Sequence, residues 1–304
     1  MKKRSFIKIC GKDIKVEGRL IRIARLDGEK FTFPDDPEAL LSGLRTCGTR
    51  IDLFTFLQKL PETLPKYAYP REWDNLAVLP VSTFEHWWTE QIGFKARNKA
   101  KQAEKKGVDL REVPFDDTLL NGICEIYNES PIRQGRPFPH YGMSLEGARE
   151  YAGTFLDRSI FIAAFLGDSM IGFIKLVADE TRTQACAIHI LSMLQHRDKA
   201  PTNALIAQAV RSCANRGISY LVYDHFSYGR KKEDSLSQFK EANGFQRIDL
   251  PRYYVALSPI GRVVFRSGLH HRLVEYFPEP LMTRLRELRT AWYTRKLQMS
   301  RDAS

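Results

Sequence analysis

Short blocks of apolar and polar residues alternate between Arg182 and Leu257, and the blocks have the lengths of strands and helices. The run Ala185–Ser192 is short and apolar, which is the pattern of a buried strand. Polar residues follow, and then apolar residues at helical spacing begin after Pro201 and end at Gly217. Ile218–Tyr223 is a second apolar run. The pattern therefore predicts a strand, a basic loop, a helix and a second strand.

The end of this region predicts one more helix and a closing strand. Ser235 and Gln238 have the spacing of a capping box, in which a hydroxyl caps the helix and an amide three residues later bonds back to the cap. We expect this helix to end at Asn243–Gly244. Phe245–Leu257 then predicts a strand or a hairpin that closes the sheet.

The preceding segments predict a small lobe, a long helix and a hairpin. Residues 1–80 are broken into short pieces by glycines and prolines, which indicates a small α+β lobe without a catalytic pattern. A capping box at Ser82–Glu85 predicts a helix that continues to Gly107, with a basic second half. Ser159–Leu166 and Met170–Val177 flank a two-residue turn and predict a β-hairpin.

One segment between the predicted helices has the composition of a loop. Pro131–Tyr141 holds three prolines and a glycine, so we expect irregular structure. Loops rich in arginine and aromatic residues often contact ligands, and this one is our candidate for a lid over the acceptor. A plain connector is the alternative. The expected substrate-binding residues are Arg133, Arg136, His140 and Tyr141.

Composition and charge narrow the class of partner. The 304 residues include 47 basic and 36 acidic ones, which gives a net charge of +11. Such a balance favours an anionic partner, such as coenzyme phosphates, a nucleotide sugar, tRNA or a membrane surface. A globular protein that is merely basic is the alternative.

The cysteines and the termini indicate the compartment. Five scattered cysteines, none spaced Cys-x-x-Cys, argue against disulfides and a structural zinc site. The basic start has no apolar segment after it, and no run reaches the length of a transmembrane helix. We therefore expect a cytoplasmic protein.

Several segments resemble a known superfamily. From about Asp116 to Leu257 the order of elements and the Asn-Gly-Phe ending resemble the GNAT acyltransferase fold. Ser235–Phe245 is similar to the Phe-Lys segment of the Fem-type peptidyltransferases, which attach amino acids to peptidoglycan precursors. Arg97–Val108 is similar to their basic segment before a Gly-Val, and Pro131–Pro137 resembles a stretch in bacterial relatives.

The resemblance implies the fold class and a division of the chain. We expect an α/β protein with a mixed sheet of GNAT type. A small α+β lobe would span residues 1–80, an acyltransferase domain 81–258, and a basic helical tail 259–304. The tail carries an apolar stripe, which favours docking on the core, although a basic amphipathic helix also suits a membrane surface. The stripe is Leu281, Leu285, Leu288 and Trp292.

The resemblance also implies the chemistry. We expect an N-acyltransferase that moves an acyl or aminoacyl group to an amine on a cell-envelope precursor, an amino sugar or another small metabolite. The donor would be acyl-CoA, such as acetyl-CoA, or aminoacyl-tRNA. The region around the loop His196–Asn203 would hold the donor's phosphates at a helix N-terminus, but the loop lacks the usual glycines, which leaves tRNA open. The expected donor contacts are Leu191, Ser192, Met193, His196, Arg197, Lys199, Thr202, Asn203 and Phe239.

Acyl transfer needs a base for the amine and a donor for the oxyanion. The GNAT pattern implies a backbone N–H near Ile190–Leu194 as the oxyanion donor. The Fem-type Phe-Lys pair implies that Lys240 contacts the donor; an exposed helix lysine is the alternative. For His189, a satisfied core histidine is likewise the alternative to catalysis. The candidate catalytic residues are His189, Asp224, His225, Tyr228 and Lys240.

Other functional classes have weaker support. No Ser-His-Asp order, Walker loop or metal-ligand spacing stands out, so we expect neither a hydrolase, nor a kinase, nor a bound metal. An RNA-binding protein that kept the fold without its chemistry is the main rival hypothesis. A membrane-surface adaptor that acts through residues 262–301 is another.

Overall fold

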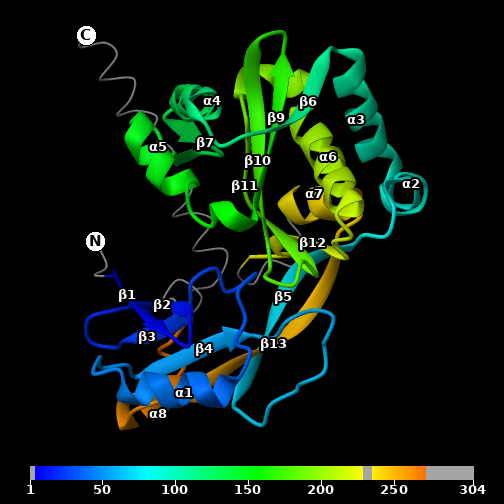
Figure 1. Ribbon diagram of the computed structural model, residues 1–304. Coiled ribbons are helices and arrows are strands. Elements are labelled where there is room, and N and C mark those ends of the chain that lie inside the picture. Colours follow the sequence, from blue (N-terminus) through cyan, green and yellow to red (C-terminus); the bar gives the residue numbers. More distant parts are fainter. Residues whose placement is uncertain (1–3, 229–234, 272–304) are drawn as a thin grey trace.

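A single mixed sheet runs through the computed structural model, which describes residues 4–228 and 235–271 (Figure 1). Its eleven strands lie in the order β1-β2-β3-β4-β13-β5-β12-β11-β10-β9-β6. The first six are β1 (Arg4–Ile9), β2 (Lys12–Glu17), β3 (Ile23–Leu26), β4 (Leu53–Leu57), β13 (Gln246–Ala256) and β5 (Arg71–Pro80). The others are β12 (Tyr220–His225), β11 (Gln184–Ser192), β10 (Ser169–Ala178), β9 (Ser159–Leu166) and β6 (Val108–Val113).

Helices cover the sheet on both faces. In Figure 1, α3 (Phe94–Lys105) and α6 (Pro201–Asn215) lie on one side of β10, and α4 (Asp117–Asn128) and α5 (Leu145–Ala152) lie on the other. The short η2 (Leu156–Arg158) follows α5. The helix α1 (Pro37–Thr46) packs on β1, and α8 (Pro259–Arg266) packs on β13 and β4. Ala96, Ala100 and Ala103 form the buried face of α3, and their small side chains allow close packing of α3 on α6.

The predicted strand–loop–helix–strand unit is confirmed. It consists of β11, a 3₁₀ segment η3 (Leu194–Lys199), α6 and β12. Gly217 follows α6 with φ of +65°, as expected of a glycine that ends a helix. The predicted hairpin is β9–β10, and Gln246–Ala256 is one strand rather than a hairpin. The helix expected from Ser235 is α7 (Ser235–Ala242).

The prediction of one helix from residue 82 to 107 is wrong. Thr83 caps a short α2 (Phe84–His86), a π-helical turn η1 (Trp87–Gln91) follows, and the chain is extended at Ile92 and Gly93 before α3 begins. The Gly93 amide donates to the carbonyl of Ala242 over 2.8 Å, and a Cβ on Gly93 would lie 3.1 Å from that oxygen. The break therefore lets the chain dock on the end of α7.

The prediction of an irregular loop at 131–141 is also partly wrong. Ile132–Arg133 (β7) pairs with Arg136–Pro137 (β8) in a small hairpin. Gln134 and Gly135 have φ of +52° and +68°, the conformation of the two-residue turns that fit the twist of a hairpin. A two-residue turn is enough to pair the strands despite the neighbouring prolines.

The sheet opens where β11 and β12 separate. These parallel strands pair from Gln184 and Tyr220 to Cys186 and Val222 only. Beyond that point β11 stays with β10, and β12 stays with β5. Ile188 is an extra residue opposite β10, since Lys175 pairs with His189 and Leu176 with Ala187. We call this opening the fork.

The C-terminal predictions lie mostly outside the described residues. The predicted apolar stripe from Leu281 to Trp292, with the basic residues beside it, lies outside the described residues. The segment Gly229–Lys232 also lies outside them. Within residues 4–228 and 235–271, no helix has the length and apolar character needed to cross a membrane.

Candidate active site

Four predicted catalytic residues lie together where β12 ends. The Tyr228 hydroxyl donates to Oδ2 of Asp224 over 2.7 Å, and the ammonium group of Lys30 forms an ion pair with Oδ1. Asp224 has φ of +52°, a left-handed conformation that aspartate and asparagine tolerate better than most residues. We call Lys30, Asp224, His225, Tyr228 and Lys240 the β12 cluster.

Lys240 is a buried cation rather than a surface lysine. Its side chain is fully buried, and its ammonium group donates to the carbonyl oxygen of His225. The ammonium nitrogen also lies 5.0 Å from the ring centre of Tyr223 and 4.9 Å from that of Tyr228. The alternative of an exposed helix lysine is therefore wrong. The neighbouring Phe239 packs with its ring centre 6.5 Å from that of Tyr223.

Burial sets the ionisation of this cluster. Burial lowers the pKa of Lys30, and burial together with the charge of Lys30 lowers the pKa of His225. The His225 imidazole is therefore less basic than that of an ordinary histidine. A carboxylate, a neutral imidazole and a phenol at one strand end are groups that can take up and deliver protons.

A second cluster lies on the β11 arm of the fork. His189 has a ring nitrogen 3.3 Å from the hydroxyl of Tyr127, and its ring centre lies 5.5 Å from that of His140. The Tyr151 ring lies 4.6 Å from His140. We call Tyr127, His140, Tyr151 and His189 the β11 cluster. The structure thus brings His189, a predicted catalytic residue, into contact with His140, a predicted substrate-binding residue.

Buried surroundings make His189 a weak base. Burial, followed by the charges of His140 and Lys175, lowers the pKa of His189 to about 3. Lys175 pairs with His189 across the strands, and burial lowers its own pKa to about 8. The Lys175 ammonium donates to the carbonyl of Ala152 over 2.7 Å. The β12 cluster differs in that it holds a carboxylate, that of Asp224, 4.0 Å from a ring nitrogen of its histidine.

Glu129 binds two backbone amides just before the predicted phosphate loop His196–Asn203. One carboxylate oxygen accepts from the Leu194 amide over 2.7 Å, and the other accepts from the Gln195 amide over 2.9 Å. Arg133 pairs with Glu129 over 2.9 Å and donates to the carbonyl of Ser192 over 2.8 Å. Arg133 therefore ties the end of β11 to α4, and this anchoring position does not fit the predicted lid.

The other predicted loop residues take varied positions. The hydroxyls of Ser192 and Thr202 form a hydrogen bond of 2.9 Å. The side-chain amide nitrogen of Asn203 donates to the side-chain oxygen of Asn243 over 3.3 Å. No side chain caps α6, whose first turn begins at Pro201. Arg197, Arg136 and Tyr141 are exposed, Met193 is buried, and the partly buried ones are Leu191, His196 and Lys199.

Several residues of these clusters are brought together only by long-range contacts. Glu129 reaches amides 65 and 66 residues away, and Lys30 reaches Asp224 from a distant part of the sequence. Lys175 had a usable signal, because a lone lysine within an apolar strand is buried only with partners.

The mixed sheet, the fork between parallel strands and the loop before a helix define a GNAT-type acyltransferase fold, which confirms the predicted fold class. Solved structures of Fem-type and lysylphosphatidylglycerol synthetase proteins share this fold. No family model and no curated protein matches the sequence.

Three solved structures give the extent of the similarity. The C-terminal domain of a protein assigned as a lysylphosphatidylglycerol synthetase from Agrobacterium fabrum has a TM-score of 0.56 at 12% identity, over 88% of each chain. L-PGS from Bacillus licheniformis has a TM-score of 0.56 at 12% identity, over 88% of this chain and 90% of that one. FemX has a TM-score of 0.54 at 10% identity, over 87% and 90%. At these identities the shared property is the fold.

Proposed function

We propose that the protein is an aminoacyltransferase that moves an aminoacyl group from aminoacyl-tRNA to an amine on a cell-envelope precursor. The fold supports an acyl-transferring enzyme in general. The observation that carries the choice of donor is the Glu129 carboxylate on the amides of Leu194 and Gln195, just before the predicted phosphate loop.

A coenzyme A pyrophosphate bound to the amides just before the predicted loop would meet a carboxylate. Free amides at a loop before a helix attract phosphate, but the amides of Leu194 and Gln195 already bond to Glu129. A phosphate placed there would have to displace Glu129 and would face its negative charge at close range. The loop thus favours a donor that does not depend on these two amides.

The surface beside the loop suits a polyanion. Gln102 donates to the carbonyl of Asp198 over 2.8 Å, and Lys106 pairs with the Asp198 carboxylate over 2.9 Å, so the end of α3 lies next to η3. α3 also presents exposed lysines. Several exposed cations on one helix are the kind of surface that contacts a phosphate backbone. The exposed lysines of α3 are Lys95, Lys99, Lys101 and Lys105.

The β12 cluster supplies the groups that aminoacyl transfer requires. The amine nitrogen bonds to the carbonyl carbon of the ester, and the bond to the ribose oxygen of tRNA breaks. In this proposal Asp224 and His225 take the proton of the attacking amine, and Tyr228, whose hydroxyl donates to Asp224, passes a proton to the leaving oxygen. An amide on β11 beyond Cys186, where β12 no longer pairs with it, would bind the oxyanion.

A thermal-shift titration tests the donor. Mixed aminoacyl-tRNA should raise the melting temperature by mass action, whereas coenzyme A and acetyl-CoA should leave it unchanged. A shift with acetyl-CoA that disappears in an Arg197→Ala/Lys199→Ala variant would replace tRNA by coenzyme A as the donor. No shift with any donor would favour a protein that kept the fold without its chemistry.

Removing charge from α3 should weaken tRNA binding. We expect the triple variant Lys99→Ala/Lys101→Ala/Lys105→Ala to bind tRNA more weakly. The slope of log K against log salt concentration should fall by about 0.7–0.9 for each phosphate that α3 no longer neutralises. Fluorescence anisotropy at several salt concentrations measures both effects. The control removes three exposed charges from the N-terminal part of the chain: Lys8→Ala/Arg19→Ala/Lys66→Ala. Equal losses in both variants would contradict a specific role for α3.

A further inference from the structure

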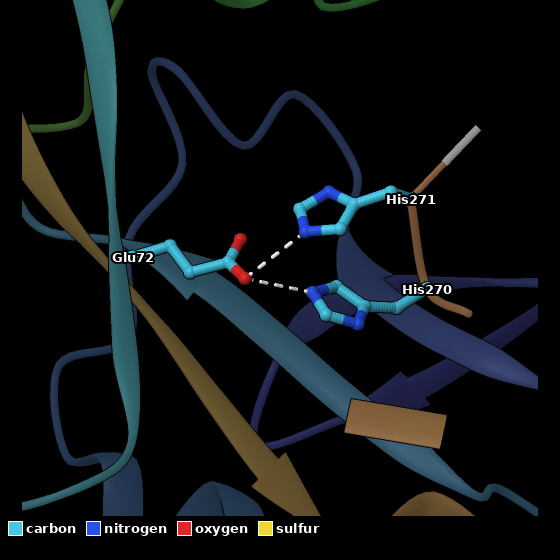
Figure 2. A group of neighbouring side chains, drawn as sticks. All are labelled: Glu72, His270 and His271. Atoms are coloured by element: carbon cyan, nitrogen blue, oxygen red, sulfur yellow. Dashed lines mark hydrogen bonds and ion pairs between the residues drawn. The ribbon is translucent and has the colours of Figure 1, made fainter. Parts of the chain in front are cut away.

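Two histidines after α8 point at one carboxylate oxygen of β5 (Figure 2). The Nε2 atoms of His270 and His271 lie 3.0 and 3.1 Å from Oε1 of Glu72. Gly268 has φ of +73°, and its carbonyl accepts from the His271 amide over 3.0 Å. This tight turn directs two consecutive side chains to the same place.

Both ring nitrogens of His270 lie close to oxygen atoms. Nδ1 lies 3.4 Å from the carbonyl oxygen of Val264, which can only accept a hydrogen bond. If Nδ1 carries the proton, Nε2 of the neutral ring presents a lone pair to the Glu72 carboxylate, which also only accepts. A proton or a cation must then lie between them.

A metal ion satisfies these atoms without an added proton on His270. Protonating that ring would place a positive charge beside His271, whose ring centre is 4.0 Å away. One divalent cation would instead accept the lone pairs of both histidines and of Glu72. Histidine ligands in metal sites commonly donate their other N–H to a backbone carbonyl, as His270 is placed to do.

The surroundings hold these side chains in position and leave one side open. The His270 side chain is only 2% exposed, and its ring lies 4.7 Å from Tyr254 and 5.1 Å from Phe265. Tyr254 also bonds to the Glu72 carboxylate. Glu72 and His271 are 33% and 35% exposed, so water can reach the open side.

We propose that Glu72, His270 and His271 bind a divalent transition-metal ion, Zn²⁺ in the first place, with water as a fourth ligand. Oxygen–nitrogen separations of 3.0 and 3.1 Å are near the roughly 3.3 Å that bonds of about 2.0 Å require in a tetrahedron. Two imidazoles and one carboxylate suit zinc better than calcium or magnesium. The sequence spacing gave no hint of this, since 198 residues separate Glu72 from His270.

Metal titration of the full-length, untagged protein tests this site. In a Cys10→Ser background, which removes an exposed thiol, ZnCl₂ should bind with one ion per chain in calorimetry. CoCl₂ should give the intense visible absorption of a tetrahedral site. His271→Ala should weaken zinc binding by at least about 100-fold, because loss of even a ligand's hydrogen-bond partner costs 10–100-fold. His86→Ala, which removes an exposed histidine, is the matched control and should bind like the parent.

Two results would overturn the site. One is equal zinc affinity in the parent and the His271→Ala variant. The other is a cobalt spectrum of the hydrated ion alone, which would leave a hydrogen-bonded Glu–His cluster. Glu72→Gln keeps the shape of the side chain and removes its charge, so a loss of binding in this variant with an unchanged circular dichroism spectrum separates lost coordination from misfolding.

Discussion

Replacing Arg252 by methionine is expected to lower the free energy of unfolding by about 3–5 kcal/mol, the usual cost of leaving buried charges without their partner. Arg252 is 6% exposed and lies on β13. Its guanidinium donates to Glu29 over 2.7 Å and to Asp74 over 2.8 Å. Methionine fills a similar volume but leaves both carboxylates without a cation. Urea unfolding followed by fluorescence measures the loss.

The same strand offers a control for this change. Arg247 is exposed and pairs with Asp249 over 3.0 Å, so Arg247→Met should change stability by less than about 1 kcal/mol. Burial alone would raise the pKa of Glu29, but Arg252 holds it below its ordinary value. The stability from this pair is therefore present above that ordinary pKa and is lost as the pH falls through the lowered one. The free energies of unfolding of the parent and of the Arg252→Met variant should therefore converge in acid. Equal stability of the two proteins at pH 7 would contradict the role of the buried ion pair.

Replacing Asp224 by asparagine should reduce aminoacyl transfer by at least about 100-fold, the lower range for loss of a general acid or base. The fold should survive, since asparagine accepts the left-handed conformation that Asp224 adopts. Lys30, whose pKa is lowered by burial, can lose its proton when its partner loses its charge. Single-turnover transfer from labelled aminoacyl-tRNA to an amine acceptor gives the rate, and the melting temperature checks the fold.

The control for this variant makes the same chemical change at the surface. Asp249→Asn removes an exposed carboxylate on β13 and should transfer at the parental rate. Tyr228→Phe should share part of the defect, because it removes the hydroxyl bonded to Asp224. Parental rates in Asp224→Asn, with donor binding intact, would move the chemistry away from the β12 cluster and leave the proposed donor standing.

Local patterns were sufficient to predict most elements of the fold. The apolar run of β11, the helical spacing of α6 and the glycine after it depend on residues close together in sequence. The prediction of one long helix from residue 82 to 107 was wrong because a distant contact breaks that helix: the chain at Gly93 packs against Ala242. Sequence patterns report propensity and burial, whereas tertiary contacts override both.

The sites were less predictable, because long-range contacts make them. Asp224, His225, Tyr228 and Lys240 were named from a strand end and from a resemblance, and they do lie together. The ionic partner Lys30 comes from a turn nearly two hundred residues earlier, which no spacing reveals. The depressed basicity of His189 depends on Tyr127 and His140, which pack on it from elsewhere.

The place of β13 determines when the chain can finish folding. Arg252 pairs with Leu57 of β4 on one side and with Glu72 of β5 on the other. Until residues 246–256 leave the ribosome, β4 and β5 lack the strand that belongs between them, and their edges remain open to wrong partners. The strands β4 and β5 are thus synthesised well before the strand that lies between them. A nascent chain stalled before β13 would therefore be more exposed to aggregation than one released only a few residues later.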